Sequence, residues 1–253
     1  MSQPKVSIIT PAYNGYQYID AAVNSIMSQT FTDFEWMIVD DSSTDLTHVL
    51  LDEASQKYDK IKVYRVHTNK GPVNARNVAM KKAVGRYIAF FDIDDLWHPD
   101  KLKNQVAFME RMDAGLSYTE YKKIDLDGNI LSRFPVPVPK RVNSHRLKKT
   151  CSIMASSAMF DTEKTGRILQ DTSVNCKDDL HFWLRILNKV GHAYGLKEDL
   201  ARLRIHTDSW TGNKLKEAKN QWTLYRKHLK LNTVQAAYYF THYAIVGTIK
   251  YIF

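Results

Sequence analysis

The amino-acid sequence predicts an α/β fold in which a parallel sheet carries helices on both faces, followed by a C-terminal helical extension. Apolar, strand-like runs alternate with segments of helical period through the first hundred residues. The composition, 44% hydrophobic and 11% aromatic over 253 residues, supplies enough apolar surface for a sizeable core. Strands and helices that alternate at this spacing form a sheet whose crossover helices cover both sides.

The first part of the chain is expected to contain four strands and four helices. Each strand is a short apolar run, and each helix has apolar residues that recur every three or four positions. The third helix opens with a proline, which suits the first helical turn. The expected strands are Val6–Thr10, Phe34–Val39, Ile61–Val66 and Tyr87–Phe91, and the expected helices are Tyr16–Gln29, Leu46–Tyr58, Pro72–Ala83 and Pro99–Met112.

The pattern is less regular after residue 113. Residues 116–130 predict two short strands joined by a turn at 125–129. The three prolines of residues 134–140 predict a loop or a sheet edge. Helices are expected at Asp178–Val190, Lys214–Lys230 and Thr233–Tyr251, and a last strand at Ala201–Ile205.

Charge is unevenly distributed along the chain. Residues 1–100 contain 10 Lys and Arg against 13 Asp and Glu, whereas the remaining residues contain 26 against 14. An acidic first part and a basic remainder suggest two different tasks. The basic part could contact nucleic acid, anionic lipid or a phosphorylated substrate.

Cysteine content and hydropathy indicate the cellular compartment. Cys151 and Cys176 are too few for a disulfide framework or a Cys-rich zinc module. The N-terminal residues lack the apolar run of a signal peptide, and no stretch of about 20 uncharged apolar residues could span a bilayer. We therefore expect a cytoplasmic globular protein.

Polar side chains follow three of the expected strands, at the points where those strands end. Residues 10–14 (TPAYN) follow the first strand, residues 40–42 the second, and residues 92–95 the fourth. In an open parallel sheet, ligands bind outside the carboxyl ends of the strands, so these clusters predict a binding site. The alternative is that the Asp and Asn residues only cap helices and form turns.

The cluster after the fourth strand suits a divalent cation. The carboxylates of Asp92, Asp94 and Asp95 would repel one another without a nearby cation. Asp92 and Asp94 can face the same side of an extended backbone, and carboxylates suit Mg²⁺ or Mn²⁺ held together with substrate phosphates. The sequence has neither G-x-G-x-x-G after the first strand nor G-x-x-x-x-G-K-[ST]. A bound nucleotide diphosphate would therefore need a metal to neutralise its phosphates.

Four motifs, in this order, resemble the family 2 glycosyltransferases of the GT-A fold. They are VSIITPAYN at 6–14, VDDSSTD at 39–45, NKGPVNARN at 69–77 and FFDIDDLWHPDKL at 90–102. The likeness covers about the first 110 residues closely and resumes at DDLHFWLRI (178–186) and RIHTDS (204–209). It implies a nucleotide-sugar-binding half at 1–112, a half with the acceptor site and catalytic base at 113–212, and the helical extension at 213–253.

The resemblance implies a nucleotide pocket in the first half. Pro11, Tyr13 and Asn14 would line this pocket, and Asp40 would read the edge of the base, usually uracil. Arg76 would approach the base or the diphosphate, and the alternative is that it is a cation on the helix surface.

The resemblance also implies a role for each residue of the acidic cluster. Asp92 and Asp94 match the DxD motif, with Asp92 toward the ribose and metal and Asp94 as the direct metal ligand. Asp95 would orient the sugar or cap the following helix. Trp97 would pack beneath the site, as aromatic residues usually do.

The second half would supply the general base. Family members usually have a Glu-Asp pair where this sequence has Asp178 and Asp179, and the spacing to FWLRI favours Asp179 as the base. Asp at a helix start is also stabilised by the helix dipole, which is the structural alternative. His206 resembles the histidine that completes the metal or diphosphate site, and a structural histidine is again the alternative.

Together these parts imply a metal-dependent, inverting glycosyltransferase. Mn²⁺ or Mg²⁺ would be the cofactor and a UDP-sugar the donor. Asp179 would deprotonate a hydroxyl of a saccharide or lipid-linked saccharide acceptor, which would attack the anomeric carbon in a single displacement. The resemblance places this chemistry in bacterial surface-polysaccharide or lipopolysaccharide synthesis.

The C-terminal extension is basic and aromatic. Residues 214–230 contain six Lys and Arg against one Glu, and residues 236–253 are rich in Tyr, Phe and Ile. Such helices can lie in a membrane interface, which would fit a lipid-linked acceptor and a location on the cytoplasmic face of the inner membrane. The alternative is that they pack over the catalytic domain.

Three other functions are weighed against this interpretation. A nucleotidyltransferase on a similar sheet would usually need a Gly-rich or basic loop after the first strand, and TPAYNGY is neither. A nucleic-acid-binding protein would interleave aromatic and basic residues on an exposed sheet, and the acidic clusters oppose it, so we expect no nucleic-acid partner. An inactive sugar-nucleotide binder is disfavoured because Asp92, Asp94 and Asp179 are all present.

Overall fold

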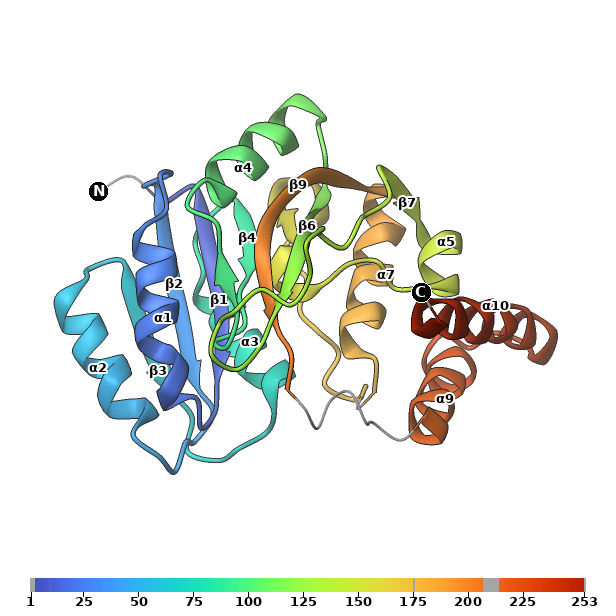
Figure 1. The fold of residues 1–253 in the computed structure, drawn as a ribbon, viewed down its shortest axis with the longest axis horizontal. Coiled ribbons are helices and arrows are strands. Elements are labelled where there is room, and N and C mark those ends of the chain that lie inside the picture. Colours follow the sequence, from blue (N-terminus) through green and yellow to red (C-terminus); the bar gives the residue numbers. More distant parts are fainter. Residues whose placement is uncertain (1–2, 175, 207–213, 253) are drawn as a thin grey trace.

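A mixed sheet forms the centre of the protein, and helices cover both of its faces (Figure 1). The structure is a computed structural model that describes residues 3–174, 176–206 and 214–252. Its strands are β1 (Val6–Ala12), β2 (Phe34–Asp40), β3 (Ile61–Arg65), β4 (Tyr87–Phe90), β5 (Leu96–Trp97), β6 (Leu116–Ile124), β7 (Arg141–Asn143), β8 (Met159–Asp161) and β9 (His192–Arg204).

The helices differ widely in length, from one turn to twenty residues. They are α1 (Tyr16–Met27), α2 (Thr47–Lys57), α3 (Pro72–Lys82), α4 (Lys101–Arg111), α5 (Ser144–Lys149), α6 (Thr162–Thr165), α7 (Asp178–Val190), α9 (Lys214–Thr223) and α10 (Thr233–Ile252). A 3₁₀ turn occupies Ala155–Ser157, and a π-helical segment, Leu224–His228, follows α9.

The first four strands are parallel, in the order β3-β2-β1-β4, as the sequence predicts. Successive residues of β1 face opposite sides of the sheet: Ile8 packs in the core beneath α1, α2 and α4, whereas Ile9 packs in the core beneath α3 and α7. The expected helices on both faces are therefore confirmed. This arrangement brings the carboxyl ends of β1, β2 and β4 to one edge.

The second half of the sheet corrects two of our expectations. Two short strands were expected within residues 116–130. The structure has one nine-residue strand there, β6 (Leu116–Ile124), and an isolated bridge between Ile124 and Ile130. The last strand, β9, begins at His192, nine residues before the expected start. The short elements β7, α5 and β8 were not expected from the sequence.

The antiparallel strand β8 joins the two halves of the sheet. It pairs with β4 on one side and with β6 on the other, and β6 in turn pairs in parallel with β9. Residues 1–112 and 113–206 therefore share one continuous sheet.

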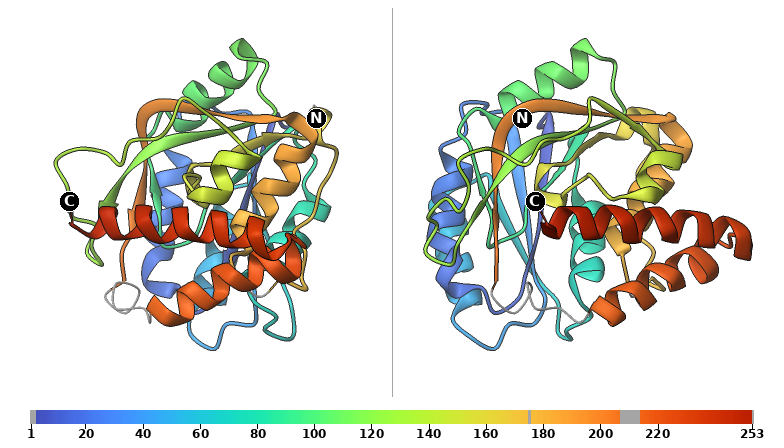
Figure 2. Two further views of the ribbon diagram at one scale, coloured as in Figure 1. Left: turned by 90° about the vertical axis from the view of Figure 1, so that its right-hand side faces the viewer. Right: turned by 45° about the vertical axis from the view of Figure 1, so that its right-hand side comes forward.

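Helices α9 and α10 extend from one side of the domain (Figure 2). Helix α10 packs against both α9 and α5, and Ala236 is fully buried there. Within the described residues, no helix is both long enough and apolar enough to cross a membrane.

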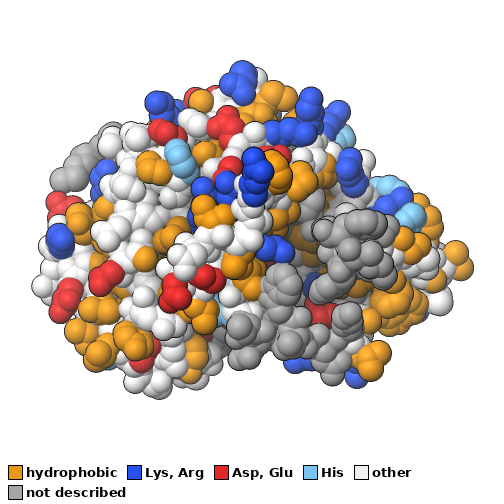
Figure 3. Space-filling view, viewed as in Figure 1, with side chains coloured by type: hydrophobic (Ala, Val, Ile, Leu, Met, Phe, Trp, Pro, Cys, Tyr) orange, Lys and Arg blue, Asp and Glu red, His pale blue; other side chains and the backbone are white. Residues whose placement is uncertain are grey.

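The charge asymmetry of the sequence is visible on the surface. Figure 3 shows Lys and Arg side chains gathered toward the upper right, over β7 and α5, while several Asp and Glu side chains lie on the left, over the N-terminal half. Hydrophobic side chains are exposed at the right edge, over the C-terminal helices.

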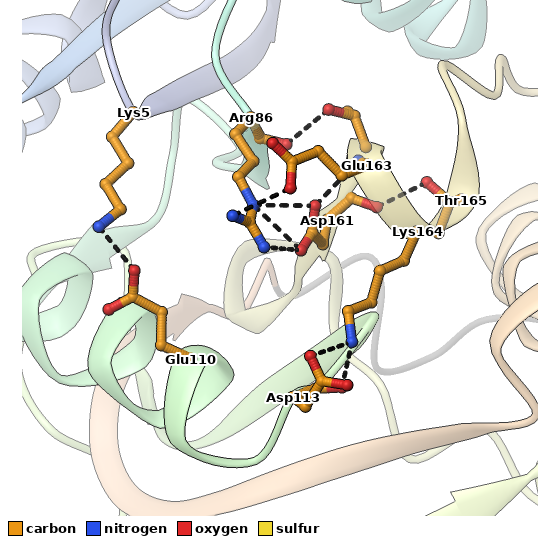
Figure 4. Close-up of polar contacts among 9 residues, drawn as sticks. Lys5, Arg86, Glu110, Asp113, Asp161, Glu163, Lys164 and Thr165 are labelled. Carbon is orange, nitrogen blue, oxygen red and sulfur yellow. Dashed lines mark hydrogen bonds and ion pairs between the residues drawn. The ribbon is translucent and has the colours of Figure 1, made fainter.

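An ion-paired cluster fastens β8 to the start of β4 (Figure 4). Asp161, which ends β8 and is 1% exposed, accepts hydrogen bonds from Nε and Nη2 of Arg86, the latter at 2.7 Å. The same carboxylate caps α6 by accepting from the backbone N–H of Glu163. Nearby, Lys164 pairs with Asp113, which is 88% exposed.

We predict that Asp161→Ala lowers the free energy of unfolding by about 1.5–3 kcal/mol, because a buried charged acceptor is lost. Asp113→Ala, in an exposed ion pair of the same cluster, should change it by less than about 1 kcal/mol. Urea unfolding of the two variants measures both values. Equal losses would contradict the joining role given to Asp161.

Candidate active site

A cavity of about 730 Å³ lies at the carboxyl ends of β1, β2 and β4. Most of the residues that the sequence analysis assigned to a nucleotide or metal site line it. They are Pro11, Tyr13, Asn14, Arg76, Asp92, Asp94 and His206. The topology thus brings together side chains that are up to 195 positions apart in the sequence.

The turn after β1 is held in place by the loop after β2. Asn14 adopts a left-handed backbone conformation (φ 48°), which asparagine tolerates better than most residues. Its backbone N–H donates to Ser43 Oγ at 3.0 Å, and its Oδ1 accepts from the backbone N–H of Thr44 at 2.9 Å. Tyr13 is left 50% exposed at the cavity wall, where its ring can stack on a planar ligand.

The structure corrects the position given to Asp40. The Asp40 side chain is 1% exposed and lies away from the cavity, where it accepts from the backbone N–H of Ser43 and pairs with Arg65 Nε at 3.2 Å. The next residue, Asp41, lines the cavity, because neighbouring residues at a strand end point in opposite directions. Its carboxylate accepts from the backbone N–H of Gly71 at 2.7 Å.

Of the three carboxylates in the acidic turn after β4, two are exposed and one is buried. Asp92 and Asp94 line the cavity with side chains 31% and 28% exposed. Asp95 is 1% exposed, and it accepts from Ser156 Oγ and from the backbone N–H of Arg204 at 2.9 Å. Burial, together with Asp94 and Asp92, raises the pKa of Asp95 well above its usual range.

Asp95 was expected to orient the sugar or cap the next helix, and the structure contradicts both expectations. It is not among the residues that line the cavity, and the residue at the N-cap of the following helix, α4, is Asp100. Its role is to anchor the end of β9 beneath the acidic turn. Trp97 lies beneath the turn as expected, 4% exposed, with its Nε1 donating to the backbone carbonyl of Ser156 at 2.7 Å.

Arg76 connects the acidic turn to the start of α7. Its guanidinium, 6% exposed, lies 2.7 Å from Asp92 Oδ1, 3.1 Å from Asp179 Oδ1 and 3.7 Å from Asp178 Oδ2. Burial alone would lower the pKa of Arg76, but Asp92 and Asp179 outweigh it and raise the pKa further above its usual range. Arg76 is therefore a buried, permanently charged residue of the site and does not lie on the helix surface.

A second cavity, of about 470 Å³, lies on the other side of Asp92. Asp92 lines both cavities, and Asp178 and Asp179 line the second. The two aspartates occupy the first turn of α7, where the helix dipole favours negative charge. Lys148 and Lys177 also line this cavity, and Tyr243 of α10 contributes to its wall.

The pKa of the Asp179 carboxyl is raised. Burial raises this pKa to about 6, Arg76 opposes the rise, and the neighbouring carboxylates of Asp178 and Asp92 add to it. The carboxylate is therefore ionised at neutral pH and still basic enough to take a proton. A base whose pKa lies near the working pH is the most effective one.

His206 lies beside the acidic turn, where its Nε2 is 2.8 Å from Asp94 Oδ2. Among the described residues, no three His, Cys, Asp or Glu side chains converge as a complete metal site. The carboxylates of Asp92 and Asp94 and the imidazole of His206 are nevertheless of the ligand types that would suit Mn²⁺ or Mg²⁺. Residues 207–209 of the RIHTDS segment lie outside the described residues.

The sequence analysis did not find several residues of the site. Ser156 donates to Asp95 and accepts from the backbone N–H of Asp92 at 3.0 Å, and no local motif marks it. Lys177 pairs with Glu217 of α9 at the edge of the second cavity. Lys177 has a left-handed backbone conformation (φ 53°) just before the predicted helix, and the composition of the sequence does not indicate it.

Comparison with known proteins identifies the relatives of the chain. Residues 7–167 match the family described as "Glycosyl transferase family 2". A Bacillus subtilis glycosyltransferase named for teichuronic acid biosynthesis, TuaG, is 38% identical over 242 residues, which is 96% of this chain and 95% of that protein. The Escherichia coli protein WfgD, named "UDP-Glc:alpha-D-GlcNAc-diphosphoundecaprenol beta-1,3-glucosyltransferase", is 32% identical over 98% of this chain and 95% of its own length.

Solved structures share the fold. TarS 1–349 of S. aureus in complex with UDP-GlcNAc superposes with a TM-score of 0.72 at 22% identity, covering 95% of this chain and 71% of that one. The mannosyltransferase PcManGT from Pyrobaculum calidifontis in complex with GDP-Man and Mn²⁺ has a TM-score of 0.70 at 17% identity, covering 95% and 70%. The expected GT-A architecture, with a helical C-terminal region, is confirmed.

We predict that Arg76→Met lowers the free energy of unfolding by about 3 kcal/mol, because three carboxylates lose their shared cation. Arg76→Lys should recover part of this loss, since lysine keeps the positive charge but lacks the planar guanidinium that donates to several carboxylates at once. As a control, Arg133→Met at an exposed position should change stability by no more than about 0.5 kcal/mol. Urea unfolding that found Arg76→Met as stable as the control would contradict the bridging role.

Proposed function

The chain belongs to glycosyl transferase family 2, and we propose that it transfers a sugar from a UDP-sugar to a hydroxyl group of a saccharide acceptor in bacterial surface-polysaccharide synthesis. One observation carries this proposal: two cavities meet at Asp92, and Arg76 joins the acidic turn of one to the carboxylates of the other. Family membership disfavours the nucleotidyltransferase and nucleic-acid-binding alternatives.

The first cavity is the donor site. A nucleobase can stack against Tyr13, with the wall that contains Asp41 and Gly71 on its other side. Asp41, in place of Asp40, is then the carboxylate available to the edge of the base. The UDP-glucose named for WfgD and the UDP-GlcNAc bound to TarS support a UDP-sugar as the donor.

Asp92, Asp94 and His206 would hold a divalent cation, Mn²⁺ or Mg²⁺, together with the donor diphosphate. The ion would supply positive charge to the departing UDP. Two contacts within the chain would fix the position of the ion. Arg76 donates to Asp92 and orients its carboxylate, and His206, which follows β9, orients the carboxylate of Asp94.

The second cavity is the acceptor site, with Asp179 as the base. The acceptor oxygen forms a bond to the anomeric carbon while the bond from that carbon to the UDP oxygen breaks, and Asp179 takes the hydroxyl proton. Because the hydroxyl enters from the Asp179 side and UDP leaves from the donor side, one displacement inverts the anomeric configuration. Asp178, 31% exposed in the same wall, can accept a hydrogen bond from another acceptor hydroxyl.

The acceptor is a saccharide carried on a lipid diphosphate. The WfgD name, which specifies such an acceptor, supports this assignment. Lys148 lines the acceptor cavity and forms no ion pair with another described residue, so it provides a cation for a phosphate, whereas Lys177 is paired with Glu217. Helix α10 forms part of the same wall, so the acceptor lies between the catalytic domain and the C-terminal helices.

Replacement of the base separates chemistry from donor binding. We predict that Asp179→Asn slows transfer about 10²–10⁴-fold while leaving UDP affinity within a factor of a few. The matched variant Asp178→Asn should lose less activity, because its carboxylate is not the base. Radiolabelled sugar transfer and UDP titration measure the two effects. Full transfer by Asp179→Asn would place the base elsewhere.

The raised pKa of Asp179 predicts a pH dependence. A base must be unprotonated, so the rate of a single turnover should be constant above about pH 7, half its maximum near pH 6, and fall about tenfold per pH unit below about pH 5. The donor and the metal are kept at saturating concentrations, so that changes in their binding with pH do not alter the measured rate. A rate that stays constant down to pH 5 would contradict this assignment.

A further inference from the structure

Two segments far apart in the sequence form one edge of the molecule. Helix α5 lies alongside α10, where His145 Nδ1 is 2.9 Å from the hydroxyl of Tyr239. Figure 2 shows α5 directly above α10 in its left view. The hydroxyl of Tyr225, in the π-helical segment after α9, also donates to the backbone carbonyl of Lys148. The C-terminal helices are therefore packed on the domain, and the exposed side chains among the described part of α10, up to Ile245, are available to a partner.

The α5 side of this edge is strongly basic. Residues 140–149 (KRVNSHRLKK) contain five Lys and Arg and no Asp or Glu, and no Asp or Glu follows Glu217. None of these five cations forms an ion pair with another described residue. Lys148 and Lys149 instead lie over the rings of Tyr239 and Tyr238, with Nζ 5.3 Å and 5.0 Å from the ring centroids. The positive charge is therefore left to attract an external anion.

The free side of α10 exposes apolar side chains in a single stripe. Val234, Tyr238 and Ile245 are 80%, 45% and 52% exposed. With exposed Thr241 they follow a spacing of four, three and four residues, which keeps all of them on one helix face. This stripe directly borders the cations, because Tyr238 contacts Lys149.

We propose that this edge docks on the surface of an anionic phospholipid bilayer. The stripe on α10 would enter the boundary between headgroups and acyl chains, with tyrosine rings at headgroup depth and the lysines of α5 against lipid phosphates. An apolar stripe alone would equally suit a protein partner. The adjoining basic segment, whose five cations form no ion pair with a carboxylate of the described residues, favours an anionic lipid surface.

The docking has a consequence for the acceptor. Tyr243 of α10 and Lys148 of α5 both line the acceptor cavity. A bilayer bound to this edge would therefore place the mouth of the cavity beside the headgroups, within reach of a lipid-linked saccharide. This consequence rests on the proposed function, whereas the docking itself does not.

Vesicle flotation of the full chain, without donor or acceptor, tests the docking. We expect binding to vesicles that contain phosphatidylglycerol, little binding to phosphatidylcholine alone, and weaker binding at high salt. Tyr238→Glu with Ile245→Glu should abolish binding, and Val234→Ser should weaken it. Arg146→Gln with Lys149→Gln should lower the partition coefficient about fivefold for each cation removed.

A matched control uses the opposite end of the molecule. Leu46→Glu with Val49→Glu, at positions 61% and 39% exposed at the start of α2, adds the same charge far from α10 and should bind as wild type does. Thermal melting checks that each variant is folded. If the double glutamate variant of α10 does not fold, the binding of Val234→Ser tests the role of the stripe. Any of three results would overturn the proposal. The wild-type protein does not bind the vesicles, the α10 variants bind as tightly as wild type, or the control variant loses as much binding as the α10 variants do.

Discussion

The buried guanidinium of Arg76 is the interaction on which the arrangement of the site depends. It lies between Asp92, at the end of β4, and Asp178 and Asp179, at the start of α7. A cation buried among three carboxylates is favourable only while all partners stay in place, because an unpaired buried charge is costly. This requirement fixes α3, β4 and α7 relative to one another, and with them the two cavities that meet at Asp92.

A second polar network holds the other side of the acidic turn. The buried carboxylate of Asp95 binds Ser156 and the backbone N–H of Arg204, while Arg204 Nε donates to the backbone carbonyl of Asp94 at 2.7 Å. The end of β9 is thereby fastened to the turn, and His206, two residues further on, comes to lie beside Asp94. The turn that carries Asp92 and Asp94 is thus held by Asp95, Ser156 and Arg204, none of which is among the residues that line the cavity.

The strengths and failures of the sequence analysis have physical causes. Local periodicity and the grouping of polar residues at strand ends were sufficient for β1 to β4 and for the acidic turn. The difference between Asp40 and Asp41 was not accessible, because a single position at a strand end decides which face a side chain occupies. Strand β8 has three residues and is stabilised by partners on β4 and β6, so its own sequence carries little signal. Ser156 was missed for the same reason, since only tertiary contacts give it a role.

We propose that the cavity between Tyr13 and His206 binds a UDP moiety together with a divalent cation. Calorimetric titration of UDP with Mn²⁺, repeated with EDTA and with GDP, tests it most directly in wild type and Asp94→Asn. We expect UDP binding that requires Mn²⁺ and is lost in Asp94→Asn. Equal UDP binding in EDTA or in the variant would contradict the metal-linked donor site, and preferential binding of GDP would contradict UDP as the nucleotide.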